Sequence, residues 1–263
     1  MPTLEAICYS STIDATRPTT YVDDRKLGYR FMCAEAAWIL SGDDRVETIK
    51  PYSKEIERFS DNGVTFFGAY GPKLVEQWDY CLDKLASSPD TRQAVINIWR
   101  EQPPGTKDVP CTLSWQFLIR RNLLHLVATM RSSDAWLGWP YDVFTQAMII
   151  HAMCLDLRQK GINVSPGCVT LTAGSQHLYE KNLFGALACL RSAVEPSGLS
   201  LDIGYLSTKE QLIEQLWLVA RTDTCAHDLQ NNFLINLKFL LDHKQRLDHD
   251  QRMKAIEGEN HGH

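Results

Sequence analysis

The sequence predicts an α+β fold with a central sheet flanked by helices. Three runs in the middle third, residues 93–99, 112–119 and 123–130, alternate apolar and polar residues or are continuously apolar, as strands do. Segments on both sides, residues 31–41 and 142–159, carry apolar residues at helical spacing. Of the 263 residues, 44% are hydrophobic and 22% are charged. These values exclude a disordered chain and allow one sizeable core.

The first part of the chain is predicted to hold two helices joined by a loop. Residues 31–41 form a helix that ends at Gly42 and contains Glu35. Because a carboxylate in so apolar a helix is costly to bury alone, Glu35 is expected to face a polar cavity or a cation. Residues 63–72 (GVTFFGAYGP) are typical of a glycine-rich loop, and residues 74–86 of a second helix followed by a turn.

After the three strands, the pattern returns to helices. Residues 142–159 predict a long core helix, residues 169–173 a short strand, and residues 176–190 a helix entered from a glycine-containing turn. Residues 208–256 are helix-prone and become polar toward the terminal GENHGH, which fits a frayed tail better than a metal site. We therefore expect residues 1–263 to form a single domain.

The composition also excludes several classes of protein. A formal net charge of −5 argues against a general nucleic-acid binder, which needs a basic face. The longest apolar stretch is interrupted by polar residues, and the first residues lack a basic region followed by an apolar one. We expect neither a membrane span nor a secretory signal. The eight cysteines form no CxxC pair and fit reduced thiols. The prediction is a cytoplasmic protein, in the host cytoplasm if viral, without a metal.

Residues 110–142 hold the most informative motifs. Cys111 follows a proline at a predicted strand start, and after the next strand comes RSSDAWLGWPYD, residues 131–142, read as a loop with an arginine and two aspartates. With AEAAWILSG, GAYG, SPDTRQAV and GSQHLY, these motifs resemble the thymidylate synthase family in residue type and order. The resemblance covers about residues 30–190, whereas residues 200–256 differ. It implies a mixed sheet flanked by helices, with a helical C-terminal region.

The resemblance implies one-carbon transfer to C5 of a pyrimidine. Cys111 is then the nucleophile: its thiolate adds to C6 and makes C5 an enamine-like carbon that attacks the donor, 5,10-methylenetetrahydrofolate. Arg131 is expected to lower the pKa of this thiol. Glu35 and Tyr70 organise proton transfer, and the apolar helix around Glu35 should raise its pKa toward a useful range.

Other positions match binding residues of the family. The resemblance implies that Arg131 and Ser132 hold the phosphate and that His177 and Tyr179 bind the sugar hydroxyl. The folate is contacted by Asp134, Leu137 and Gly138. Core packing explains Leu137 equally well.

Arg92 matches the first of two arginines that the family contributes to the phosphate site from the neighbouring subunit of a homodimer. The second position is Gln93 here, so this site has one cation fewer. The candidates to replace it are Arg17, Arg25, Lys26 and Arg30. An ordinary surface charge explains each of these four equally well.

Asp142 stands where the synthases carry an asparagine that recognises uracil. An asparagine amide donates to O4 and accepts from N3–H of uracil, whereas cytosine offers an N4 amino donor and an N3 acceptor. A protonated carboxyl group accepts from the N4 amino group and donates to N3. Asp142 therefore predicts a cytosine nucleotide, and its proton would also activate the ring. The alternative is a helix N-cap, since Asp142 directly precedes the predicted helix.

Three further departures from the synthases follow, and the last two bear on the product. Thr112 replaces the histidine that follows the cysteine in synthases, as in the cytidylate hydroxymethylases of large phages. Residues 52–63 (YSKEIERFSDNG) stand where an aromatic folate-side segment is expected, and the chain does not end in the apolar tail that closes the synthase site. Because closure excludes water and favours hydride transfer, an open site favours water.

The predicted activity is therefore that of a dCMP 5-hydroxymethyltransferase. Three alternatives stay open. They are a CMP 5-hydroxymethylase of nucleoside-antibiotic biosynthesis, a dCMP 5-methyltransferase, and an inactive homologue that binds nucleotide.

Overall fold

The computed structural model describes residues 2–19, 25, 27–53, 55–101, 103–191 and 206–221. Its five strands form one mixed sheet in the order β1-β5-β4-β3-β2. They are β1 (Thr3–Asp14), β2 (Val95–Asn97), β3 (Thr112–Arg120), β4 (Leu123–Asp134) and β5 (Ser165–Tyr179). Strands β4 and β5 pair in parallel, and every other pair is antiparallel. The predicted α+β class with a mixed sheet is confirmed.

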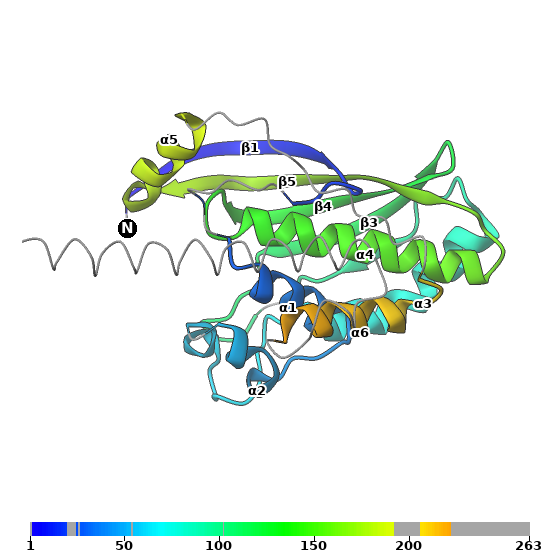
Figure 1. Ribbon diagram of the computed structural model, residues 1–263, viewed down its shortest axis with the longest axis horizontal. Helices are drawn as coiled ribbons and strands as arrows, with labels where there is room; N and C mark the ends of the chain where they lie inside the picture. Colours follow the sequence, from blue (N-terminus) through cyan, green and yellow to red (C-terminus); the bar gives the residue numbers. More distant parts are fainter. Residues whose placement is uncertain are drawn as a thin grey trace, which may run out of the picture.

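Helices cover one face of this sheet (Figure 1). The long helix α4 (Trp139–Gln159) joins the parallel strands β4 and β5 and is buried on nearly all sides. It packs between the sheet and α1 (Tyr29–Leu40), and α6 (Lys209–Ala220) packs on α1 and α4. The remaining elements are α2 (Val46–Ile49), α3 (Gly71–Ser87), α5 (Leu183–Arg191) and the 3₁₀ turns Lys50–Tyr52, Ile56–Phe59 and Glu180–Asn182. None of the described helices is long and apolar enough to cross a membrane.

The strands contain the two largest differences from the sequence prediction. Residues 176–179, expected to begin a helix, continue strand β5, because β1 pairs with all four of them and β4 pairs with Gln176 and His177. Strand β1 was not predicted; its side chains are mostly exposed, so it lacks the alternating burial that marks a strand in sequence. The predicted strand 93–99 shortens to β2, and the predicted strand 169–173 is the middle of β5.

The predicted helices are confirmed with shifted ends. The helices expected at 31–41, 74–86 and 142–159 begin at Tyr29, Gly71 and Trp139. Residues 209–220 form α6, while the rest of the helix expected over 208–256 lies outside the described residues.

Strand pairing is interrupted at one level across four neighbouring strands. The unpaired residues are Cys8 in β1, Gly174 in β5, Arg131 in β4 and Leu113 in β3. Cys8 has a positive φ of 56°, and a Cβ on Gly174 would lie 3.1 Å from the carbonyl oxygen of Arg131. Irregular pairing of this kind bends strands and redirects side chains. At this level the backbone N–H of Arg131 in β4 donates to the carbonyl of Cys111 at 2.8 Å, so the irregular pairing lies beside the PC motif.

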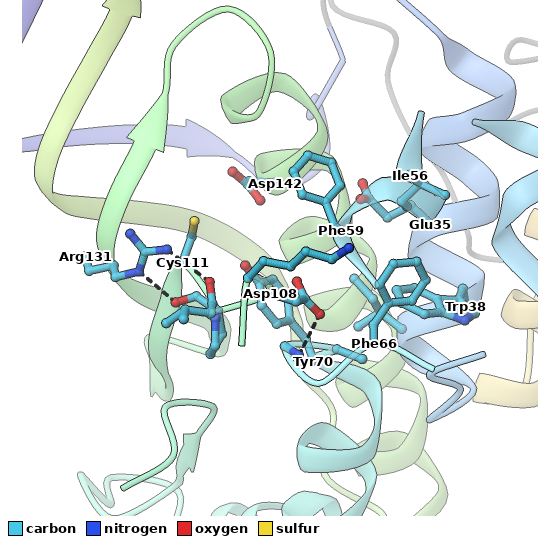
Figure 2. A pocket seen from close by; sticks show the side chains of 16 residues that line it. Glu35, Trp38, Ile56, Phe59, Phe66, Tyr70, Asp108, Cys111, Arg131 and Asp142 are labelled. Atoms are coloured by element: carbon cyan, nitrogen blue, oxygen red, sulfur yellow. Dashed lines mark hydrogen bonds between the residues drawn. The ribbon is translucent and has the colours of Figure 1, made fainter. Parts of the chain in front are cut away.

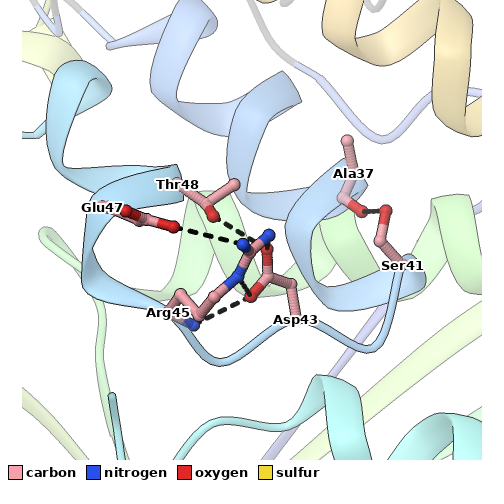
Figure 3. Close-up of polar contacts among 6 residues, drawn as sticks. All are labelled: Ala37, Ser41, Asp43, Arg45, Glu47 and Thr48. Carbon is pink, nitrogen blue, oxygen red and sulfur yellow. Dashed lines mark hydrogen bonds and ion pairs between the residues drawn. The ribbon is translucent and has the colours of Figure 1, made fainter. Parts of the chain in front are cut away.

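A polar network fixes the chain just after α1 (Figure 3). The Asp43 carboxylate accepts hydrogen bonds from the backbone and side chain of Arg45 and from the Thr48 hydroxyl, and Ser41 Oγ donates to the Ala37 carbonyl at 2.7 Å. Burial alone would raise the pKa of Asp43, but these hydrogen bonds lower it to about 2. The carboxylate therefore stays ionised and holds the turn that ends α1, the helix that carries Glu35.

Candidate functional site

A cavity of about 340 Å³ lies where α1, the segment before α3, the segment before β3 and the first turn of α4 meet (Figure 2). This size is near the lower end of small-molecule sites, which span roughly 300–1,000 Å³. Five of the residues predicted from the sequence line it together. They are Glu35, Tyr70, Cys111, Arg131 and Asp142. Segments far apart in the chain thus bring the predicted nucleophile, two carboxyl groups and a cation into one space.

The two carboxyl groups come to the cavity from different helices. Burial, and then the nearby Asp142, raises the pKa of Glu35 to about 8, so the predicted upward shift is confirmed. Burial, and then Asp134, raises the pKa of Asp142 to about 7. The N-cap alternative for Asp142 is wrong, because α4 begins earlier and its N-cap is Gly138. Near neutral pH, each of these two groups therefore has a proton to donate.

The predicted effect on Cys111 is only partly right. Arg131 does lower the pKa of the Cys111 thiol, as expected, but burial raises it by more, and Asp142 and Asp108 add to that rise. The guanidinium of Arg131 also supports the backbone. Its Nε donates to the Pro110 carbonyl and a terminal nitrogen donates to the Val109 carbonyl, both at 3.0 Å. Arg131 thus fixes the two residues that precede Cys111.

Tyr70 is held in place at the N-cap of α3. Its hydroxyl accepts a hydrogen bond from the Thr112 backbone N–H at 3.3 Å, and its ring packs edge to face on Trp115 with centroids 5.7 Å apart. Burial, with smaller contributions from Cys111 and Asp142, raises the pKa of the phenol. The hydroxyl therefore keeps its proton and can offer it in the cavity that Cys111 also lines.

Of the residues predicted to bind the phosphate and sugar, Arg131 lines the cavity, whereas Ser132, His177 and Tyr179 lie on adjacent strands outside its lining. Ser132 on β4 and His177 on β5 are joined by a 3.4 Å contact between the hydroxyl and Nδ1. The His177 ring meets Tyr179 edge to face, with centroids 5.2 Å apart. Ser132 and Arg131, expected in a loop, belong to strand β4, which extends to Asp134. The parallel β4–β5 pairing brings this hydroxyl and imidazole together.

Asp134 caps the turn between β4 and α4. One carboxylate oxygen accepts the backbone N–H groups of Trp136 and Leu137 at 2.8 and 2.9 Å, while Oδ2 is buried without a hydrogen-bond partner in the described structure. Such an oxygen can accept one further hydrogen bond. Leu137 is 50% exposed, so core packing does not explain it. Gly138 follows as the N-cap of α4.

The arginines proposed for the phosphate differ in their surroundings. Arg92 is exposed and outside the cavity, and its backbone carbonyl accepts from Gln116. Arg25 lies over the Trp136 ring at 4.1 Å and donates to the Trp136 carbonyl. Arg30 donates to the Ala220 carbonyl, and Arg17 is exposed. Lys26 lies outside the described residues.

The cavity has a second half that sequence reasoning missed. Its wall is apolar and largely aromatic, made by Trp38, Ile39, Ile56, Phe59, Phe66 and Ala69. Two charged residues, Lys107 and Asp108, also line it. Asp108 lies three residues before Cys111 in sequence. This closeness to the predicted nucleophile was the sequence feature that could have identified it. Among the described residues, no group of three or more His, Cys, Asp or Glu is placed to hold a metal ion.

Glu35→Gln should reduce the dependence of stability on pH. Since the folded-state pKa of Glu35, about 8, exceeds that of an unfolded glutamic acid, the folded protein binds the proton more tightly, and its free energy of unfolding falls as pH rises through this range. The glutamine cannot ionise, so the variant should lose this fall and be more stable than the wild type at the alkaline end. Thermal unfolding between about pH 5 and pH 9 measures the effect. The exposed Glu214→Gln is the control. Parallel Glu35→Gln and wild-type curves would contradict the assignment.

Comparisons with known proteins agree with this arrangement. The family model described as thymidylate synthase matches residues 2–219. The thymidylate synthase of Enterobacteria phage T4 is 26% identical over 229 residues, covering 76% of this chain and 78% of that protein. The deoxyuridylate hydroxymethyltransferase of Bacillus phage SP01 is 30% identical over 182 residues, covering 62% of this chain and 46% of that protein.

The fold agrees as well. The crystal structure of T4 thymidylate synthase superposes with a TM-score of 0.63 at 22% identity, covering 81% of this chain and 83% of that one. Since the family model spans more than four fifths of the sequence, the chain belongs to the thymidylate synthase family, whose members transfer a one-carbon unit from methylenetetrahydrofolate to a pyrimidine nucleotide.

Proposed function

We propose that the protein hydroxymethylates C5 of dCMP, using 5,10-methylenetetrahydrofolate and water. The observation that carries this proposal is the carboxyl group of Asp142, which lies in the same cavity as Cys111 and has a pKa of about 7. A carboxylic acid that is still partly protonated at neutral pH both accepts from an amino group and donates to a ring nitrogen, the pair of contacts that cytosine offers.

Recognition and activation of the base then use the same proton. Donation from Asp142 to N3 draws electrons out of the ring and makes C6 more electrophilic. The Cys111 sulfur adds to C6 and C5 becomes the carbon nucleophile. Glu35 and Tyr70, which line the same space, serve the proton transfers at C5 and the exocyclic groups.

The residues present also fit the one-carbon donor. The aromatic wall of Trp38, Phe59 and Phe66 suits a flat heteroaromatic ring. Asp134, which is outside that cavity lining, has a buried Oδ2 that can accept one further hydrogen bond. When bound, the folate supplies the CH₂ unit that becomes attached to C5. Leu137 and Gly138 adjoin Asp134 at the start of α4 and are the other proposed contacts of the donor.

Two observations favour water over hydride as the final reactant. A relative at 30% identity bears the name of a hydroxymethyltransferase. The cavity also carries charged side chains, Lys107 and Asp108, on the segment before Cys111, and charged side chains favour the presence of water. Phosphate binding is assigned to Arg131 and Ser132, and the sugar hydroxyl to His177 and Tyr179, in line with their common end of the sheet.

Mass spectrometry of the products tests the reaction directly. The protein is incubated with methylenetetrahydrofolate and, separately, dCMP, CMP and dUMP. We expect a gain of CH₂O on dCMP, and Cys111→Ser should abolish it while leaving dCMP binding within about threefold, because the thiol is needed for bond formation and not for binding. A gain of CH₂ would mean methylation, and a preference for CMP would change the sugar assignment. Binding of dCMP without turnover would leave a nucleotide-binding homologue.

Asp142→Asn should change which base is used. The amide presents a donor and an acceptor that suit O4 and N3–H of uracil and leave one mismatched contact with cytosine. We expect the ratio of kcat/KM for dCMP to that for dUMP to fall by at least about 100-fold, because a mismatched buried polar contact is strongly penalised. Glu35→Gln is the matched control: it should slow both substrates without changing their ratio. An unchanged ratio in Asp142→Asn would show that Asp142 does not recognise the base.

We also propose that the active form is a homodimer in which Arg92 serves the partner's phosphate site. Arg92 is exposed and outside its own chain's cavity. The N-terminal strand exposes three large apolar side chains, Leu4, Ile7 and Tyr9, by 51–72%, and exposed apolar residues of this kind suit a subunit contact.

Mixing two inactive variants tests this arrangement. Arg92→Ala and Cys111→Ser homodimers should each be inactive or nearly so. In a mixed dimer, one site holds both an intact Cys111 and an intact Arg92 from the partner. After subunit exchange at equal concentrations, activity should rise to about a quarter of the wild-type value, since half of the dimers are mixed and each has one of two sites intact. No recovery, with subunit exchange demonstrated by a tag, would place Arg92 in its own chain's site.

A further inference from the structure

We propose that Asp108 is the base that takes the proton from the water molecule added to the one-carbon unit on C5. This inference rests on the proposed hydroxymethylation and assigns its last chemical step to a residue that the sequence motifs do not include. Three properties of Asp108 support it: its place in the cavity, the contacts that hold it, and the carboxylate oxygen that remains available.

Asp108 faces the cavity with one oxygen committed and the other available. Oδ2 accepts the backbone N–H of Gly68 at 2.7 Å. Gly68 permits this close approach, because a Cβ there would lie 2.5 Å from the Asp108 carbonyl oxygen and 3.0 Å from Oδ1. No hydrogen bond joins Oδ1 to any other described residue, and the side chain lines the cavity. Oδ1 is therefore free to accept a hydrogen bond from water.

The segment that carries Asp108 is fixed on both sides. Before it, the Thr106 hydroxyl donates to the Asp61 carboxylate and accepts from the Asp108 backbone N–H at 3.0 Å, and the Lys107 N–H donates to Asp61 at 3.2 Å. After it, Arg131 holds the carbonyls of Val109 and Pro110. Asp108 is thus set at a constant position relative to Cys111, as a base acting on a group bound to that cysteine must be.

The position of Asp108 suits water addition better than that of the other two acids. Asp142 and Glu35 occupy one side of the cavity, near the start of α4 and on α1, and both carry protons near neutral pH. Figure 2 shows Asp108 on the other side, between Cys111 and the aromatic wall formed by Trp38 and Phe66. That wall is the proposed place of the folate. Water that enters when the folate leaves reaches the attached carbon beside Asp108.

The step balances without an oxidant or a reductant. Its starting point is the nucleotide with Cys111 sulfur bonded to C6 and an exocyclic methylene at C5. The oxygen of water bonds to the methylene carbon while Asp108 takes one proton of the water. The π electrons of the methylene move into the ring, C5=C6 re-forms, and the C6–S bond breaks to release the Cys111 thiolate. The proton on Asp108 returns to the thiolate or to solvent.

Oxygen exchange into the product tests this step without any folate. By microscopic reversibility, the enzyme incubated with 5-hydroxymethyl-dCMP in H₂¹⁸O should expel the hydroxyl group and replace it with ¹⁸O, which mass spectrometry detects. Asp108→Asn keeps an oxygen to accept the Gly68 N–H but cannot take a proton. It should lower the exchange rate by about 100-fold, the usual contribution of a general base. Tritium release from [5-³H]dCMP in a single turnover, with enzyme in excess over dCMP and methylenetetrahydrofolate present, reports only the steps before water addition and should stay within about threefold of wild type.

Glu101→Gln is the control, since Glu101 is exposed and belongs neither to the cavity lining nor to the contacts that hold Asp108. It removes one negative charge and should leave the exchange rate within about threefold of wild type. The proposal is overturned if Asp108→Asn exchanges oxygen as fast as wild type, or if exchange and tritium release fall by the same factor. If the wild-type protein itself neither exchanges oxygen nor makes a hydroxymethyl product, the proposed function fails and this assignment fails with it.

Discussion

The burial of two carboxyl groups between α1 and α4 is the constraint on which the rest of the site depends. Both helices carry many buried apolar residues, such as Met32 and Met148. They pack against each other because this contact removes those side chains from water. This packing brings Glu35 and Asp142 together in a space that disfavours charge. Their cost of burial is reduced by protonation, as their pKa values of about 8 and 7 show. The fold thus keeps two acids in their donor form in the cavity that we propose for the pyrimidine base.

The same burial acts against the nucleophile. It raises the pKa of the Cys111 thiol, and Arg131, which lowers that pKa, also has to hold the carbonyls before the cysteine. A free thiolate waiting for substrate is therefore not the state that this site favours. Addition in which the thiol passes its proton to solvent as its sulfur bonds to C6, while Asp142 gives a proton to N3, avoids a separate buried anion on sulfur. The proposed recognition of cytosine and the activation of the cysteine are then one event.

Much of this site was predictable from local motifs, and the reasons for the failures are physical. Cys111, Arg131 and Asp142 lie within one segment whose residues are in the order of a known family, so the family match placed all three. The direction of the pKa shift of Glu35 followed from its apolar helix. The continuation of β5 through residues 176–179 was not predictable, because pairing with β1 and β4 overrides local pattern. Asp108 was missed since its role depends on a contact with Gly68, 40 positions away in sequence.

The three cavity acids differ in one respect that gives them different roles. Asp108 receives a backbone N–H, and this hydrogen bond favours the ionised carboxylate, although burial, the larger effect, raises the pKa of Asp108 overall. In the described structure no N–H group donates to the side chain of Glu35 or Asp142, and burial makes both hold their protons. The proposed reaction needs one proton donated to N3 of the pyrimidine and another removed from water. It therefore requires a proton donor and a proton acceptor in one small cavity. A backbone N–H that donates to Asp108, and none that donates to Glu35 or Asp142 in the described structure, lets carboxyl groups serve in both roles.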